Sequence, residues 1–226
     1  MRDARREFYM ANALLAISNH ATFMGGGEHS FVDLISHLPG EYPVVASIPS
    51  EDALAKRIRE RNIFTVINPL PPIRPTCIHQ IVKTILQFRR LCRKRNIRLI
   101  YANGSRAAFY GGIVGRMSAI PVIWHCRISE PDPCLDGILV RLAGRVIANS
   151  KATALRFSPR FQKKIETVYN GFDLKWLKEE DVKRPNWIDR DWSVILVVAR
   201  ASRWKRHDLI LQAFEKVACS EKSVRL

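Results

Sequence analysis

The stretch LIYANGSRAAFYGGIVGRMSAIPVIWHCR, residues 99–127, decides how the rest of the sequence is interpreted. Short apolar runs at 97–103 and 120–126 flank its middle part, and such runs are typical of buried strands. Between them, Ser105 is placed to cap a helix that we expect to end near Met117. A strand, a helix and a second strand in this order predict a parallel βαβ unit.

The same alternation continues on both sides of this unit. Apolar, β-branched runs alternate with amphipathic segments, and the proline-rich segment 69–75 is predicted to be a loop. The pattern predicts an α/β fold, a Rossmann-like doubly wound parallel sheet with helices on both faces. The other strands are expected at 12–18, 42–48, 63–69, 144–150 and 164–170, and the other helices at 28–37, 51–61 and 76–95, with one more after Ser150.

The chain is expected to hold one whole domain and part of a second. We expect residues 1–175 to form the first domain and the polar segment 176–192 to be an interdomain linker. The apolar run 193–199 and a helix at 208–218 would then open a second Rossmann-like domain. A single strand and helix cannot bury their own apolar faces, so we expect residues 193–226 to be a truncated domain.

The chain is strongly basic. Its 226 residues include 37 Lys and Arg against 21 Asp and Glu, a net charge of +16. This charge favours anionic partners such as nucleic acid, anionic lipid or phosphorylated substrates, although a solvated basic surface also explains it. Five cysteines without a C-x-x-C pair indicate free thiols in a reducing compartment. No apolar run reaches the roughly 20 residues that span a bilayer, so we predict a cytoplasmic protein.

The helix expected at 76–95 combines an apolar face with a basic remainder. Its apolar face is predicted to consist of Ile78, Ile81, Val82, Ile85 and Leu86. Such a helix fits peripheral docking on the inner face of an anionic membrane. A core-packed helix with a solvated basic face explains the pattern equally well.

The glycine loop MGGGEHS, residues 24–30, lies between the first expected strand and its helix. Glycines let backbone N–H groups approach a ligand closely, and a helix N-terminus favours anions. Open α/β sheets bind ligands at the carboxyl ends of their strands, although a plain tight turn is the alternative. The loop lacks G-x-G-x-x-G spacing, which argues against an oxidoreductase. The glycines of GGIVGR, residues 111–116, fall inside a predicted helix, where close packing explains them better.

Three further side chains are candidates for the chemistry. His125 ends the strand 120–126, where it can hydrogen-bond a sugar hydroxyl or act near a reacting centre. A hydrogen-bonded core histidine is an equal alternative. Arg200 and Lys205 follow the run 193–199 and can stabilise the charge of a departing nucleoside diphosphate without a metal. A basic loop on a basic protein is the plainer explanation of both.

Taken in order, these motifs resemble glycosyltransferase family 4, and the resemblance covers nearly the whole chain. The glycine loop is similar to the family's GGxE motif, and residues 99–127 look like its fourth and fifth strands. The remaining matches are RVIANS (145–150), VYNGFD (168–173), which resembles the signature before the hinge, and VARASRWKRHDLILQAF (198–214), which resembles the start of the donor domain.

The resemblance implies a GT-B fold and a retaining transfer reaction. A sugar would pass from a nucleotide-sugar donor to a glycan or lipid-linked acceptor, with no metal and no other cofactor. His125 would lie near the transferred sugar. The implied donor-side residues are Gly26, Gly27, Arg200 and Lys205, and the implied acceptor-side residues are Glu28, Asn103 and Arg127.

The sequence also departs from the family pattern. Ala199 and Arg206 stand where glycines are usual, and Arg206 is expected either to crowd the phosphates or to add a contact. The family's Glu-x7-Glu donor motif would lie beyond Leu226. We therefore expect residues 1–226 alone to have little or no transferase activity.

Two alternatives from other functional classes remain open. A non-hydrolysing sugar-nucleotide epimerase shares the architecture of two Rossmann-like domains. A non-catalytic basic binding module would explain the charge. No recognised nucleic-acid motif is present, so we expect no nucleic-acid partner.

Overall fold

A computed structural model describes residues 12–23, 25–171 and 184–226, apart from the side chain of Trp204. The chain divides into two compact units, residues 1–172 and 173–226. Each unit is described by itself. Of the predicted linker 176–192, residues 176–183 lie outside the described residues.

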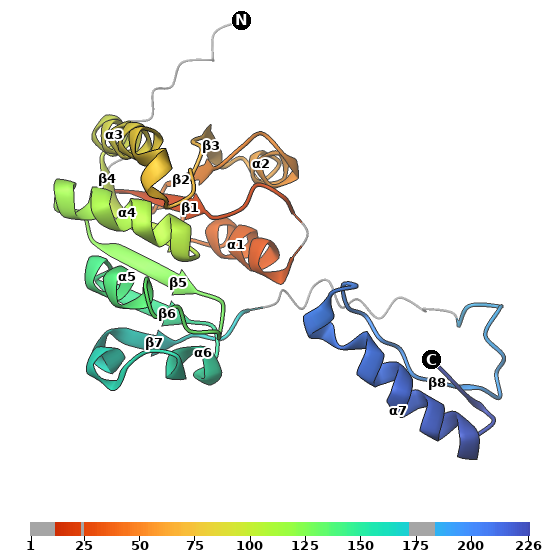
Figure 1. Cartoon of the computed structure of the whole chain (residues 1–226). Coiled ribbons are helices and arrows are strands. Elements are labelled where there is room, and N and C mark those ends of the chain that lie inside the picture. Colours follow the sequence, from red (N-terminus) through yellow and green to blue (C-terminus); the bar gives the residue numbers. More distant parts are fainter. Residues whose placement is uncertain (1–11, 24, 172–183) are drawn as a thin grey trace, which may run out of the picture. The chain divides into compact units, whose positions relative to one another are not determined.

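The described part of the first unit alternates strands and helices (Figure 1). The strands are β1 (Ala13–Ser18), β2 (Val44–Ile48), β3 (Phe64–Ile67), β4 (Ile97–Asn103), β5 (Val122–Cys126), β6 (Arg145–Ala148) and β7 (Ile165–Thr167). The helices are α1 (Gly26–Ser36), α2 (Ala53–Arg59), α3 (Ile78–Lys94), α4 (Ser105–Ser118), α5 (Asp136–Leu142) and α6 (Lys151–Leu155), with short 3-10 helices η1 (Pro75–Cys77) and η2 (Pro159–Lys164).

The strands form one parallel sheet in the order β3-β2-β1-β4-β5-β6-β7. The order runs outward from β1 in one direction and then outward from β4 in the other, as in a doubly wound fold. The predicted fold class is therefore confirmed.

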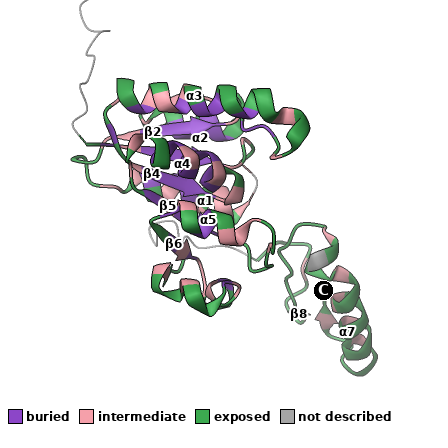
Figure 2. Cartoon of the chain, turned by 60° about the vertical axis from the view of Figure 1, so that its left-hand side comes forward, coloured by how far each residue is buried: buried purple, intermediate pink, exposed green. Residues whose placement is uncertain are grey.

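The two faces of the sheet carry separate cores, because side chains alternate along each strand. Leu15 and Ile17 of β1 belong to the core under α3, α4 and α5. Ala16, between them, belongs to the core under α1 and α2. Figure 2 shows the resulting layer of buried residues between the helices. The carboxyl ends of the central strands are thus held between two packed layers.

The glycines of α4 are needed for close packing, as predicted. A Cβ atom added at Gly115 would overlap Cγ2 of Val122 and would lie 2.7 Å from the carbonyl oxygen of Ile120. One added at Gly112 would lie 2.7 Å from Cβ of Leu142. The absence of side chains here lets α4 approach β5 and α5 closely.

Helix α3 differs from its prediction in which side chains it buries. Ile81 and Ile85 pack into the core with Phe88, whereas Ile78 and Val82 are about half exposed, at 52% and 49%. The predicted apolar face was too wide for one contact with the sheet. It divides into a buried row and an exposed row, and the exposed row also includes Leu86.

Helix α5 was not predicted at all. Its sequence DGILVRL is only seven residues long, below the length at which periodicity is informative. A buried ion pair between Asp136, its first residue, and Arg156 of the later chain anchors it. This tertiary contact has no local signal in the sequence.

The described part of the second unit contains strands β8 (Ser193–Val194) and β9 (Val224–Arg225), the 3-10 helix η4 (Arg203–Lys205) and α7 (His207–Ser220). The predicted strand 193–199 is wrong beyond Val194, because β8 pairs only with the two residues of β9. Leu196 and Val198 are 81% and 86% exposed, and α7 buries no residue. None of the described residues of this unit is buried.

Because α4 approaches β5 so closely at Gly115, adding one methyl group at this position should destabilise the protein. Gly115→Ala should lower the free energy of unfolding by about 1–3 kcal/mol, because the Cβ atom forces β5 and α4 apart. Urea unfolding followed by circular dichroism measures this change. Gly40→Ala is the matched control, since an added Cβ there meets nothing within 4 Å. Equal stability of the two variants would contradict the packing argument.

Candidate functional site

The candidate site lies at the carboxyl edge of the sheet, where the strand order reverses between β1 and β4. Helix α1, which follows β1, and helix α4, which follows β4, pack on opposite faces. Open α/β sheets bind ligands at such reversals. Ser18, Asn103 and His125 lie side by side here, because Ser18 pairs with Asn103 and Asn103 pairs with His125 in the sheet register.

The glycine loop forms the start of α1 at this edge. Gly25 is the N-cap in extended conformation and makes no side-chain cap hydrogen bond, so the helix begins at Gly26, earlier than predicted. An added Cβ at Gly26 would meet nothing within 4 Å, whereas one at Gly27 would lie 3.5 Å from Cδ of Arg127. The carboxylate of Glu28 folds back over Gly25, where the helix dipole favours a negative charge.

His125 is buried and has one ring nitrogen without a partner. It is only 6% exposed. Its Nδ1 lies 2.6 Å from the hydroxyl of Tyr101 and 3.4 Å from Nη2 of Arg127. Arginine can only donate, so Nδ1 is the acceptor and the ring proton belongs on Nε2. Nε2 is buried and has no hydrogen-bond partner among the described residues. The N–H group on Nε2 of His125 is therefore available to donate a hydrogen bond at the carboxyl end of β5.

The surroundings of His125 keep it neutral. Burial, with a smaller contribution from the charge of Arg127, lowers the pKa of His125 to about 3. Burial also raises the pKa of Tyr101 to about 12, so its phenol stays protonated and can donate to Nδ1. At neutral pH the imidazole is thus a hydrogen-bond donor through Nε2, and it is neither a cation nor a free base at that atom.

Arg127 joins three segments of the chain around His125. Its Nε donates to Oδ1 of Asn103 at 2.6 Å, and its Nη1 donates to Oδ1 of Asn170 at 2.8 Å. The hydroxyl of Ser30, on α1, donates to the same Asn170 oxygen at 3.2 Å. The structure therefore brings together His125, Asn103 and Arg127, and it places Gly27 against Arg127.

The loop after Arg127 is fixed by a buried ion pair. Nε of Arg156 donates to Oδ2 of Asp136 at 3.0 Å, and its Nη2 pairs with Oδ1. The two side chains are 3% and 14% exposed. Nη1 of Arg156 also donates to the carbonyl oxygen of Ile128 at 2.6 Å. These contacts hold the backbone of the residue that follows Arg127.

Three residues of this network were missed by the sequence analysis, namely Tyr101, Asn170 and Ser30. Tyr101 and Asn103 are two residues apart on β4, so they share a face, which is a signal that could have found Tyr101. Asn170 lies in the VYNGFD motif without an assigned role. Ser30 carries no local signal, because its contact spans 140 residues.

Arg200 and Lys205 belong to the second unit. The carbonyl oxygen of Arg200 accepts a hydrogen bond from Nε2 of His207 at 2.9 Å, and Lys205 ends η4. Arg206 has φ 51°, in the left-handed region that glycine adopts without strain, which explains why a glycine suits this position. Its guanidinium pairs with the carboxylate of Asp208, with 2.9 Å between Nη2 and Oδ2.

The described residues contain neither a candidate metal site nor a candidate membrane-spanning helix. Nowhere in them do three His, Cys, Asp or Glu side chains gather in a way that could hold a metal ion. Among the helices of the described ranges, none is both long and apolar enough to cross a membrane.

Comparisons with known proteins agree on one fold. A family model described as Glycosyltransferase Family 4 matches residues 24–176, whereas no curated protein matches the chain. Among solved structures, Alr3699/HepE of Anabaena in complex with UDP and glucose has a TM-score of 0.70 at 20% identity, covering 93% of this chain and 59% of that chain. A glycosyltransferase from Rickettsia africae has a TM-score of 0.72 at 13% identity, covering 93% and 58%.

The fold of this chain is also similar to that of an epimerase. A putative UDP-N-acetylglucosamine 2-epimerase from Listeria monocytogenes has a TM-score of 0.56 at 12% identity, covering 96% of this chain and 62% of that chain. The chain thus spans less than two thirds of the length of each of these three proteins. At such identities the likeness shows the fold alone.

The environment of His125 predicts that its imidazole does not titrate between pH 8 and pH 5. Its folded pKa of about 3 lies below the usual 6.5, so the unfolded chain binds a proton that the folded chain does not. Stability contributed by the neutral ring is present above about pH 6.5 and is lost as the pH falls toward 3. Carbon-13 NMR of the imidazole measures the titration. A midpoint between pH 5 and pH 8 would contradict this account.

Proposed function

The chain belongs to glycosyltransferase family 4, and from that premise we propose that it is the acceptor-side part of a retaining glycosyltransferase. The enzyme would transfer a sugar from a nucleotide-sugar donor to a glycan or lipid-linked acceptor, without a metal. The donor class is supported by the similar fold of Alr3699/HepE, which was solved with UDP and glucose.

One observation carries this proposal, the unpartnered Nε2 of His125 at the carboxyl edge of the sheet. A buried N–H group without a partner costs about 1–3 kcal/mol, so a ligand acceptor there would be strongly favoured. A sugar hydroxyl or ring oxygen is such an acceptor. In this role His125 positions the transferred sugar and holds no proton that the reaction consumes.

The other residues at this edge are proposed to hold the substrates around that sugar. The backbone of Gly26 and Gly27 opens α1, whose N-terminus favours the donor phosphates or an anionic acceptor. Arg127 and Asn103 form one hydrogen-bonded pair beside His125, and we place them with Glu28 on the acceptor side. Arg127 also orients the ring through Nδ1 of His125.

Arg200 and Lys205 are proposed to hold the donor diphosphate. Two cations close to the departing diphosphate would stabilise the negative charge that develops when the glycosidic bond breaks. We further propose that residues 1–226 alone catalyse little or no transfer, because the acidic motif of the family's donor pocket is not among them.

Sugar-nucleotide epimerisation is the second candidate function, favoured by the similar fold of the Listeria protein. The two reactions differ in their products. An epimerase converts one nucleotide sugar into another of the same mass, whereas a transferase releases a nucleoside diphosphate and lengthens its acceptor. Mass spectrometry of reaction mixtures separates the two.

Binding to the candidate site can be tested on residues 1–226 directly. We expect members of a panel of nucleotide sugars and free sugars to shift the NMR signals of the His125 imidazole and of the Gly26 and Gly27 amides. Arg127→Gln should weaken this binding about tenfold, because it removes a charged hydrogen-bond donor that orients His125. The amide of Gly40, which is exposed, is the internal control. If no ligand of either class moved these signals, the proposed site would be wrong.

We also propose that α3 docks on an anionic membrane surface. Its exposed row of Ile78, Val82 and Leu86 follows helical spacing, with exposed fractions of 52%, 49% and 43%. Lys83 and Arg90 are exposed beside this row, and α3 contains no acidic residue. An apolar row bordered by cations complements a lipid surface that carries negative headgroups.

The docking proposal predicts that substitutions in the exposed row of α3 weaken binding to anionic vesicles. The double variant Val82→Glu, Leu86→Glu should reduce co-sedimentation with phosphatidylglycerol vesicles about tenfold or more, because it replaces apolar contacts with like-charge repulsion. Leu155→Glu is the matched control, since Leu155 is 80% exposed on α6, away from α3. If the unsubstituted protein bound zwitterionic and anionic vesicles equally well, the docking proposal would be wrong.

A further inference from the structure

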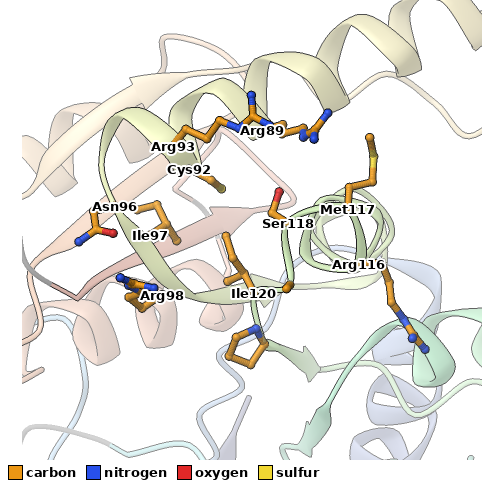
Figure 3. Close-up of a pocket in the computed structure, with 12 residues that line it drawn as sticks. Arg89, Cys92, Arg93, Asn96, Ile97, Arg98, Arg116, Met117, Ser118 and Ile120 are labelled. Atoms are coloured by element: carbon orange, nitrogen blue, oxygen red, sulfur yellow. The ribbon is translucent and has the colours of Figure 1, made fainter.

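A hollow lies at the opposite edge of the sheet from the candidate site. It has a volume of about 690 Å³ and is lined by the C-terminal parts of α3 and α4 and by the residues that begin β4 and precede β5 (Figure 3). Ile97 begins β4 and Pro121 precedes β5 at this amino edge, whereas Asn103 and His125 lie at the far ends of the same strands. The two sites are therefore separated by the length of the strands.

The hollow carries a surplus of positive charge. Arg89, Arg93, Arg98 and Arg116 line it, and none of the described residues that line it is acidic. Arg93 and Arg116 lie in the last turns of their helices, where a cation offsets the partial negative charge of the helix end. Arg89 and Arg98 have no such explanation. Burial also raises the pKa of Cys92 to about 12, so this lining thiol adds no negative charge.

Two buried polar atoms of residues that line this hollow have no hydrogen-bond partner in the described part of the chain. They are Nε of Arg89, on α3, and Oγ of Ser118, on α4. Figure 3 shows the hydroxyl of Ser118 pointing from α4 toward the side of the hollow that α3 forms. Leaving one such atom unpaired costs about 1–3 kcal/mol, so two in one hollow indicate a missing partner. Because Nε of arginine can only donate, that partner is an acceptor.

We propose that this hollow binds a phosphate group. A phosphate offers several acceptor oxygens, which match donors that converge from two helices, and arginine forks suit its geometry. The side chains of Arg89 and Arg93 would hold the charge, and the hydroxyl of Ser118 would donate to one oxygen. The group belongs either to a soluble phosphorylated molecule or to a phospholipid headgroup, and the chemistry of the site is the same for both.

The experiment measures phosphate binding directly on residues 1–226. Pyrophosphate is titrated while the amide signals of Ser118 and Ala119 are followed by NMR. In parallel, vesicles that contain phosphatidylglycerol are sedimented with the protein. Arg93→Gln and Ser118→Ala are the test variants. Arg61→Gln is the control, because Arg61 is exposed just after α2 and does not line the hollow.

We expect Arg93→Gln and Ser118→Ala each to weaken binding about tenfold, because each removes a donor to a charged group. The control should change binding by less than about twofold, because Arg61 does not line the hollow. If pyrophosphate binding shows this pattern, the source is a soluble phosphate. If only vesicle binding shows it, the source is a headgroup.

Two outcomes would overturn the proposal. An equal loss in Arg61→Gln and Arg93→Gln would mean that general charge attracts the anion. Unchanged binding in both test variants would mean that the hollow is not used. The test does not depend on the proposed transferase activity, because none of these variants alters a residue of the carboxyl-edge site.

Discussion

The reversal of strand order between β1 and β4 is the constraint on which the rest of the first unit depends. The chain leaves β1 toward one face of the sheet and leaves β4 toward the other, and a single side chain secures the point of divergence. Oδ1 of Asn19, just after β1, accepts from the backbone N–H of Ala107 at 2.7 Å and so caps α4. Gly104 makes room for Asn19: its φ is 106°, and a Cβ atom there would lie 2.8 Å from Cγ of Asn19. With this junction fixed, the ends of β1, β4 and β5 present their side chains along one edge.

The two edges of the same sheet differ in their electrostatics. At the carboxyl edge, the charge of Arg127 is distributed over two asparagine oxygens, and the atom left without a partner is the neutral Nε2 of His125. At the amino edge, several guanidinium groups surround a hollow whose described lining residues include no carboxylate. The first arrangement suits the neutral hydroxyls of a sugar, whereas the second suits an anion. The cations of a protein with a net charge of +16 are therefore not spread evenly over the two edges of its sheet.

The fold could be predicted from the sequence because its strands are short, apolar and regularly spaced. His125 could be placed because it lies at the end of a strand, whereas Asn103 and Arg127 were expected only from the resemblance to the family. Helix α5 could not be found, since it depends on the ion pair between Asp136 and Arg156. The buried face of α3 was predicted too broadly, because periodicity does not tell which part of a wide apolar face meets the sheet. The role of Asn170 depends on contacts with Arg127 and Ser30 that lie 43 and 140 residues away in sequence.

Asn170 also gives the site a mechanical property. One amide oxygen accepts from both Arg127 and Ser30, and it sits only two residues before the boundary between the two units. A pull on the chain at that boundary would stretch both hydrogen bonds at once. The strain would reach the imidazole of His125 through a single guanidinium, since Arg127 touches both Asn170 and His125. One amide oxygen near the end of the first unit therefore links the backbone there to the hydrogen-bonded groups around His125.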